Sequence, residues 1–205
     1  ALFADLHFGE DDFSDSQALK FYKLVLEERQ PQLVVILGDL ASGYARNSKT
    51  TGWFERNWRS VVDLLESHSS ALRWIYLVGN HDSEGDLTRN EIYNLDATHP
   101  QSCTLKTGAV ENFRGPDNAY VIKTHAQNGQ PVFIWSLNSA REVCLGVERW
   151  GCVSPAQVAW VRQTLNFIEA DAGKISSQVA MAHVFFQHIP VQQLMNLWNE
   201  DAGDN

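Results

Sequence analysis

The sequence predicts an α/β fold in which strands and helices alternate along the chain and form layers. Two observations support this prediction. Short apolar runs that end at polar or glycine residues are typical of strands buried on both faces, and the stretches between them have helical spacing of apolar residues. Strands that alternate with helices need crossover connections, which indicates β-α-β units.

The predicted elements follow from these patterns in order. Five apolar runs predict strands, at residues 1–4, 33–37, 74–78, 132–135 and 179–182. Helical spacing covers residues 17–28 and 53–67. A third helix is predicted to begin at Ser154 and Pro155, an N-cap followed by proline in the first turn, and to extend through Ile168.

Two connections have patterns of their own. Asn128 and Gly129 separate residues 120–123 from the apolar run at Pro131, which predicts a hairpin with a tight turn. Residues 79–118 are polar and weakly periodic, so we expect a long irregular segment there.

Length and composition bound the class of protein. The chain has 205 residues, so the prediction is a single domain over residues 1–205. An apolar fraction of 44% and a charged fraction of 20% are close to the averages of soluble globular proteins. The net charge is −9 and the basic residues are dispersed, which argues against binding of duplex nucleic acid. Nothing in the composition indicates an oligomeric state.

The sequence indicates a soluble chain and leaves its compartment open. No apolar run is long enough to span a bilayer, so no transmembrane segment is predicted. The chain begins inside an apolar run, so a removed signal peptide would leave no trace, and a secreted protein or one of an endomembrane lumen remains possible. Cys144 and Cys152 flank a short loop, and a disulfide or two free thiols are both open.

Residues that can bind metal ions follow the predicted strands, and α/β folds bind ligands at the carboxyl ends of their strands. Asp5 and His7 are two positions apart, so in an extended segment both point to one side and can reach one ion. Asp39 follows Gly38 after the next strand, and its two oxygens are enough to bridge two cations. Taken singly, each motif is more common as an ordinary turn or a helix cap.

The motif Gly79-Asn80-His81-Asp82 is more specific. The amide oxygen of Asn80 can bind a cation without adding charge, and His81 beside it can contact a phosphate group. Further along, His188 follows the apolar run 179–186, at the point where Pro190 ends the strand, a suitable place for a metal ligand. His183, within that run, is predicted to be a hydrogen-bonded core histidine.

These motifs, in this order, resemble the calcineurin-like metallophosphoesterase family over nearly the whole chain. The resemblance implies a catalytic domain with a layered β-sandwich flanked by helices, in an αββα arrangement. The chain is most similar to the purple-acid-phosphatase-like branch that lacks a metal-binding tyrosine, because Ser42 stands three positions after Asp39.

The resemblance also implies a site for two transition-metal ions, manganese, iron or zinc. Asp5, His7 and Asp39 would bind the first ion. Asp39, Asn80 and His188 would bind the second, so Asp39 would bridge the two.

The implied reaction is hydrolysis of a phosphate ester by a water that the two ions activate. His81 would contact the phosphate together with Asn80 and either protonate or stabilise the leaving oxygen, and Asp82 would orient His81. Arg89 is either a second phosphate contact or a solvated surface residue. Three aromatic residues could line a leaving-group pocket, although helical spacing favours a place in the core: Trp53, Phe54 and Trp58.

One motif of the family is missing, because no G-H-x-H follows His188 before Asn205. We therefore expect a catalytic domain truncated at both ends, without its C-terminal part. The alternative is a catalytically weakened phosphoesterase-like binding module that lacks part of its metal site.

Overall fold

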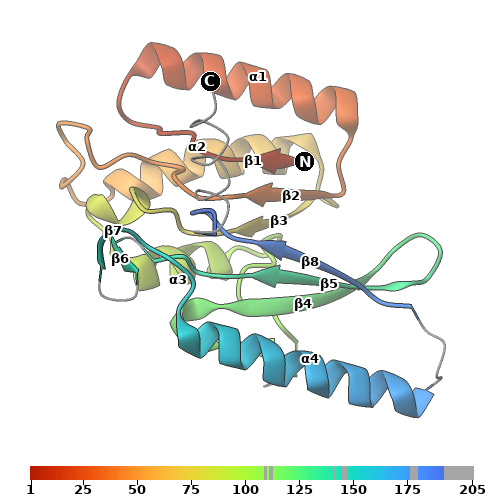
Figure 1. Ribbon diagram of the computed structural model, residues 1–205. Coiled ribbons are helices and arrows are strands. Elements are labelled where there is room, and N and C mark those ends of the chain that lie inside the picture. Colours follow the sequence, from red (N-terminus) through yellow and green to blue (C-terminus); the bar gives the residue numbers. More distant parts are fainter. Residues whose placement is uncertain (109, 111–112, 141, 145–146, 176–179, 192–205) are drawn as a thin grey trace, which may run out of the picture. The chain divides into compact units, whose positions relative to one another are not determined.

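The computed structural model describes residues 1–108, 110, 113–140, 142–144, 147–175 and 180–191. The chain divides into two compact units, Ala1–Gly108 and Ala109–Asn205. Each unit has a three-stranded sheet of its own (Figure 1). The single domain predicted from the length stays a prediction.

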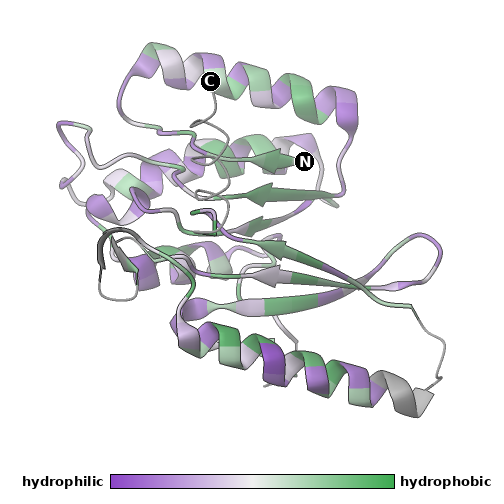
Figure 2. Cartoon of the chain, viewed as in Figure 1, coloured by the Kyte–Doolittle hydropathy of each residue, from purple (hydrophilic) through white to green (hydrophobic). Residues whose placement is uncertain are grey.

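The first unit is built from two β-α-β connections. Its sheet has the order β1-β2-β3 and is parallel throughout, with β1 at Leu2–Phe3, β2 at Leu33–Ile36 and β3 at Arg73–Tyr76. Helix α1 (Asp12–Arg29) joins β1 to β2, and α2 (Trp53–His68) joins β2 to β3. Strands β1 and β2 are hydrophobic, as Figure 2 shows. The predicted alternation is confirmed for this unit.

The two helices differ in how well their starts could be predicted. Helix α1 begins before residue 17, because the carboxylate of Asp11 accepts hydrogen bonds from the backbone N–H groups of Phe13 and Ser14. Helix α2 begins at Trp53 as predicted. Its aromatic residues are buried, which confirms the core interpretation and contradicts the pocket: Trp53, Phe54 and Trp58.

The expectation of a long irregular segment over residues 79–118 was wrong in its middle. Helix α3 occupies Arg89–Thr98, after the short 3-10 helix η1 (Asp82–Glu84), and a further 3-10 helix, η3, covers Pro116–Asn118. Thr88 and Glu91 form a capping box at the start of α3. The helix buries Asp96, whose carboxylate accepts hydrogen bonds from the indole N–H groups of Trp58 and Trp74 and so ties α3 to α2 and β3.

The second unit has a mixed sheet in the order β4-β5-β8. Strands β4 (Tyr120–His125) and β5 (Pro131–Ser136) are antiparallel, which confirms the predicted hairpin, and β8 (Ala182–Phe186) runs parallel to β5. The strand predicted at 179–182 therefore starts later, and Val179 lies outside the described residues. Helix α4 covers Pro155–Ile175, and the Ser154 hydroxyl accepts a hydrogen bond from the N–H of Gln157, as expected of an N-cap.

A buried cluster holds the second unit together. It combines side chains of the sheet with one face of α4: Phe113, Ala119, Val121, Phe133, Trp135, Leu137, Trp160 and Ile168. Strands β6 (Glu142–Cys144) and β7 (Val147–Trp150) form a separate antiparallel pair, next to which Cys144 and Cys152 are joined by a disulfide. Within the described parts of the chain, the helices are too short or too polar to cross a bilayer.

Candidate metal centre

The chain segments that follow β1 and β2 run side by side past the ends of the strands. The N–H of Asp5 donates to the carbonyl of Gly38 (3.1 Å), and the N–H of His7 donates to the carbonyl of Asp39 (3.0 Å). These hydrogen bonds continue the parallel pairing of β1 with β2. They bring the Asp-x-His motif and the Gly-Asp motif to the same edge of the sheet.

The backbone is strained at three of the predicted ligands. Asp5, His7 and Asp39 have φ values of 55°, 51° and 50°, in the left-handed region that residues with side chains rarely adopt. Such strain costs of order 1–3 kcal/mol per residue and tends to collect at functional sites. Its occurrence at all three residues indicates that the fold holds these side chains in a defined arrangement.

The side chain of Asp39 lies close to those of Asp5 and His7. Nε2 of His7 lies 3.8 Å from Oδ2 of Asp39, and carboxylate oxygens of Asp5 and Asp39 lie within 4.8 Å of each other. Asp39 is 2% exposed and Asn80 is 7% exposed. Carboxylate and amide oxygens with an imidazole nitrogen are a donor set that suits manganese, iron or zinc.

The segment after β3 approaches the cluster of Asp5, His7 and Asp39 at Gly79. A Cβ atom at Gly79 would lie 2.2 Å from Oδ1 of Asp39, so only glycine allows the chain after β3 to come this close. The N–H of His81 then donates to the same Oδ1 at 2.7 Å. The residues of the first unit thus fit a metal centre at the carboxyl ends of its three strands.

Asp82 was expected to orient His81, but its hydrogen bonds go elsewhere. Its carboxylate is fully buried and accepts hydrogen bonds from the backbone N–H groups of Asp39 (2.9 Å), Ala41 (3.1 Å) and Gly79 (2.6 Å). Burial raises the pKa of Asp82, and the N–H of Ala41 opposes that rise. Asp82 therefore clamps the ends of β2 and β3 together, and its hydrogen bonds do not go to His81.

Tyr76 completes the surroundings of Asp82. The phenol of Tyr76 is fully buried and interacts electrostatically with the Asp82 carboxylate. Burial raises the pKa of Tyr76 well above its ordinary value, and the nearby Asp82 carboxylate raises it further, so the phenol keeps its proton.

The two histidines of the cluster have glutamate partners that sequence reasoning missed. Nδ1 of His81 lies 2.9 Å from Oε2 of Glu84, and Nδ1 of His7 lies 3.2 Å from Oε1 of Glu10. A hydrogen bond with Ser42 lowers the pKa of Glu10, against the effect of desolvation, and His7 lowers it further. In both pairs the glutamate is the third residue after the histidine, and this spacing was the available signal.

The segment that carries Glu84 is fastened at several points. The carboxylate of Asp86 accepts hydrogen bonds from three N–H groups at the start of α2, those of Gly52, Trp53 and Phe54. The ammonium group of Lys49 donates to the carbonyls of Glu84 and Gly85. Glu84 is thereby fixed relative to α2 as well as to His81.

Arg89 is not the solvated surface residue that was one interpretation of it, and its contact with phosphate stays a prediction. Its guanidinium group is partly buried and donates to the carbonyls of Val78 (2.7 Å) and Gly79 at the end of β3. These bonds hold the backbone just before Asn80 in place.

The remaining predicted ligand, His188, belongs to the second unit. It follows β8 and is half-buried. The neighbouring N–H of Ile189 donates to the Ser139 hydroxyl at 3.0 Å, which holds this turn to the segment that follows β5. His183 accepts a hydrogen bond from the indole of Trp135 at 3.1 Å, as predicted, but is half-buried instead of in the core.

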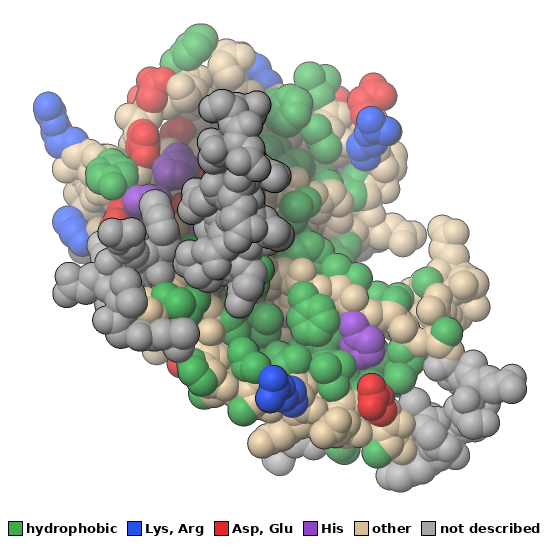
Figure 3. All heavy atoms as spheres, viewed as in Figure 1, with side chains coloured by type: hydrophobic (Ala, Val, Ile, Leu, Met, Phe, Trp, Pro, Cys, Tyr) green, Lys and Arg blue, Asp and Glu red, His purple; other side chains and the backbone are tan. Residues whose placement is uncertain are grey.

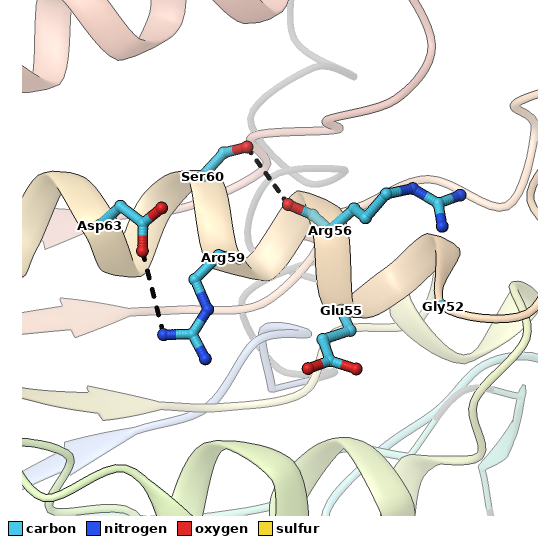
Figure 4. Close-up of a pocket in the computed structure, with 6 residues that line it drawn as sticks. All are labelled: Gly52, Glu55, Arg56, Arg59, Ser60 and Asp63. Carbon is cyan, nitrogen blue, oxygen red and sulfur yellow. Dashed lines mark hydrogen bonds and ion pairs between the residues drawn. The ribbon is translucent and has the colours of Figure 1, made fainter.

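A surface hollow along α2 is separate from the cluster. Figure 4 shows its lining, which comes from α2 and the glycine before it: Gly52, Glu55, Arg56, Arg59, Ser60 and Asp63. The guanidinium of Arg59 is paired with Asp63 at 3.9 Å. None of these residues is a predicted ligand. By contrast, histidine and acidic side chains lie side by side on the surface of the first unit in Figure 3.

Comparisons with known proteins agree with the resemblance seen in the motifs. The family model of the calcineurin-like phosphoesterases matches residues 1–200. An Arabidopsis thaliana protein named "Probable inactive purple acid phosphatase 28" is 24% identical over 224 residues, which cover 95% of this chain and 54% of that protein. The chain therefore spans about half the length of this curated relative.

A solved structure provides a comparison of folds. A dimetal phosphatase from Danio rerio superposes with a TM-score of 0.58 at 16% identity, covering 94% of this chain and 69% of that one. At this identity the likeness concerns the fold alone. It confirms the predicted α/β fold class, of the metallophosphoesterase type.

Proposed function

Because the chain belongs to the calcineurin-like phosphoesterase family, we propose that it hydrolyses a phosphate ester with two bound metal ions. One observation carries the proposal. Asp5, His7 and Asp39 are gathered at the ends of parallel strands with their backbones held in the left-handed region, next to His81. A fold tolerates this strain where the surrounding structure serves a particular arrangement of side chains.

The proposed ligands are those implied by the family resemblance. Asp5, His7 and Asp39 would hold one ion, and Asp39, Asn80 and His188 the other. When bound, the ions would offset the negative charge of the phosphate group and make an attacking water more acidic. The buried carboxylate of Asp39 suits the bridging position because its two oxygens face different neighbours. Oδ1 accepts the hydrogen bond of the His81 N–H, and Oδ2 lies near Nε2 of His7.

His81 would act on the leaving group. Its Nδ1 is engaged by Glu84, so Nε2 is the ring nitrogen left for the substrate. In the imidazolium form Nε2 would donate its proton to the oxygen that leaves with the alcohol. Glu84, in place of Asp82, would hold the ring in the orientation that this transfer needs.

The test combines metal content with hydrolysis of p-nitrophenyl phosphate, on the parent chain and on Asp39→Asn. We expect about two equivalents of transition metal in the parent, and loss of metal together with turnover in the variant. Asp63→Asn, an exposed carboxylate on α2, is the matched control and should keep both. Turnover that persists in Asp39→Asn would refute the proposed roles.

A second candidate function is a phosphoesterase-like binding module with little or no catalysis. The observation in its favour is the word "inactive" in the name of the Arabidopsis relative. Substoichiometric metal and no turnover, with manganese, iron and zinc each supplied, would favour the binding module over the hydrolase.

A further inference from the structure

Tyr44 is an exposed aromatic residue at the edge of the candidate metal centre. Its side chain is 74% exposed. The ring nevertheless has a neighbour, because its centroid lies 5.2 Å from that of His81. The His81 ring in turn lies 5.4 Å from the ring of His7.

These three rings define a direction out of the site. His7 contacts Asp39 at the candidate metal centre, His81 comes next, and Tyr44 is outermost. If His81 protonates the leaving oxygen, the group attached to that oxygen passes His81 on the side away from the metal ligands. Tyr44 is the aromatic surface that such a group meets.

The backbone of Tyr44 is held in place although its ring is exposed. The N–H of Tyr44 donates to the Ser42 hydroxyl at 3.4 Å, and the Ser48 hydroxyl donates to the carbonyl of Gly43 at 2.8 Å. A Cβ atom at Gly43 would lie 2.1 Å from Cβ of Glu84, so this turn is packed closely against the glutamate that contacts His81. A ring on a fixed backbone loses little conformational freedom when a ligand stacks on it.

We infer that Tyr44 is a specificity-determining residue, and that the substrate is a phosphate ester whose leaving group carries an aromatic ring. The inference rests on the proposed function, since it assigns the phosphate to the metal centre and the leaving group to His81. Aromatic rings prefer offset or edge-to-face contacts at centroid separations of about 4.5–7 Å, and an exposed tyrosine offers both a face and an edge.

The test compares two phosphonates that are not hydrolysed, benzylphosphonate and ethylphosphonate, so that binding is measured apart from activity. The Kd of each is determined by titration calorimetry on the metal-loaded chain. We expect the parent chain to bind benzylphosphonate about fivefold to tenfold more tightly, Tyr44→Ala to lose most of this preference, and Tyr44→Phe to keep it. Phe21→Ala removes another exposed ring, on α1, and should leave the preference unchanged.

Equal preference in the parent chain and in Tyr44→Ala would overturn the inference, and so would a parent chain that does not prefer the aromatic compound. Failure of catalysis alone gives a different result, because hydrolysis of phenyl phosphate would then be missing while the ratio of the two Kd values still reports on Tyr44. A metal-loaded parent chain that binds neither phosphonate would overturn the inference together with the proposed function. Metal content of Tyr44→Ala equal to that of the parent excludes an indirect effect through the metal centre.

Discussion

His7 and His81 each have a glutamate as hydrogen-bond partner, three residues later in the chain. A carboxylate on one ring nitrogen fixes the tautomer and the orientation of an imidazole, and this applies to a metal ligand as well as to a proton donor. The two pairs have the same local geometry but different proposed tasks. They can therefore be told apart by which property fails when the carboxylate is removed.

We predict that Glu84→Gln lowers kcat about tenfold to hundredfold while the metal content stays at the parental level. Glu10→Gln should instead weaken metal binding by a similar factor, because its partner His7 is a proposed ligand. Metal titrations and kinetics at saturating metal on the two variants measure both effects.

The two variants serve as controls for each other. If Glu84→Gln lost metal and kept kcat once metal was restored, Glu84 would be a support of the metal centre and the proposed orientation of His81 would be wrong. If both variants changed kcat and metal affinity in the same way, the proposed difference between the roles of Glu84 and Glu10 would also be wrong.

The residues of the cluster were predictable to different degrees. The motifs at Asp5, Asp39 and Asn80 were recognisable because each follows an apolar run, and the structure gathers these positions at one edge of the sheet. Glu84 was missed because it reaches His81 only through the 3-10 turn η1, which no apolar pattern indicates. Asp82 was given the wrong partner because sequence adjacency to His81 does not show that its side chain turns back to the backbone of Asp39.

At the scale of elements, the start of α2 depends on a residue far away in sequence. Gly52 occupies its N-cap position and provides no side chain, and Asp86 caps the helix instead. A carboxylate at this end also interacts favourably with the helix dipole. The same contact fastens the segment that carries Glu84.

We predict that Asp86→Ala lowers the free energy of unfolding of the first unit by about 1–2 kcal/mol, the usual cost of losing a helix cap. Urea denaturation followed by far-UV circular dichroism measures the change. Glu55→Ala, which removes an acidic residue from the first turn of α2, is the control and should cost less. An unchanged midpoint for Asp86→Ala would contradict the prediction.

Helix α3 shows where element prediction fails. Its apolar positions are few, since the buried face consists of Ile92, Tyr93 and the polar Asp96. A periodicity test finds little there, although the capping box of Thr88 and Glu91 was readable. Strands β1, β2 and β5 were easier to predict, because each coincides with a continuous apolar run, whereas β8 starts later than its predicted run.

The pairing of β5 with β8 brings Trp135 and His183 together. The indole donates to Nδ1 of His183, and the His183 ring is stacked on Phe133 with centroids 5.1 Å apart. Burial lowers the pKa of His183, and Glu169 opposes that shift. The folded state thus takes up this proton less readily than the unfolded state, whose pKa is near the ordinary 6.5.

We therefore predict that the contribution of His183 to stability is complete above its ordinary pKa and is lost as the pH falls through 6.5 toward the lowered pKa of the folded state. Thermal unfolding at about pH 7.5 and about pH 5, followed by tryptophan fluorescence, measures the loss. His183→Gln, which does not titrate, should lose less stability over this interval. A loss of the same size in both proteins would contradict the prediction.

On the scale of the whole molecule, net charge and site chemistry have to be reconciled. The chain carries a charge of −9, which disfavours a phosphate ligand, and the cluster itself is rich in carboxylates. Bound cations would reverse the local field, because they are the largest charges in such a site. The proposed function thus makes metal a requirement for substrate binding and not for the chemical step alone.

The last prediction concerns His188, the one proposed ligand in the second unit. An ion that binds only the folded protein raises its stability by RT ln(1 + [L]/Kd), about 2.7 kcal/mol at a hundredfold excess over Kd. If His188 is a ligand, His188→Ala should retain about one equivalent of metal instead of two and show a smaller rise in Tm on addition of metal. His125→Ala, which removes an exposed histidine of β4, should match the parent in both measurements. If His188→Ala bound two equivalents of metal and showed the same rise in Tm as the parent chain, His188 would not be a metal ligand.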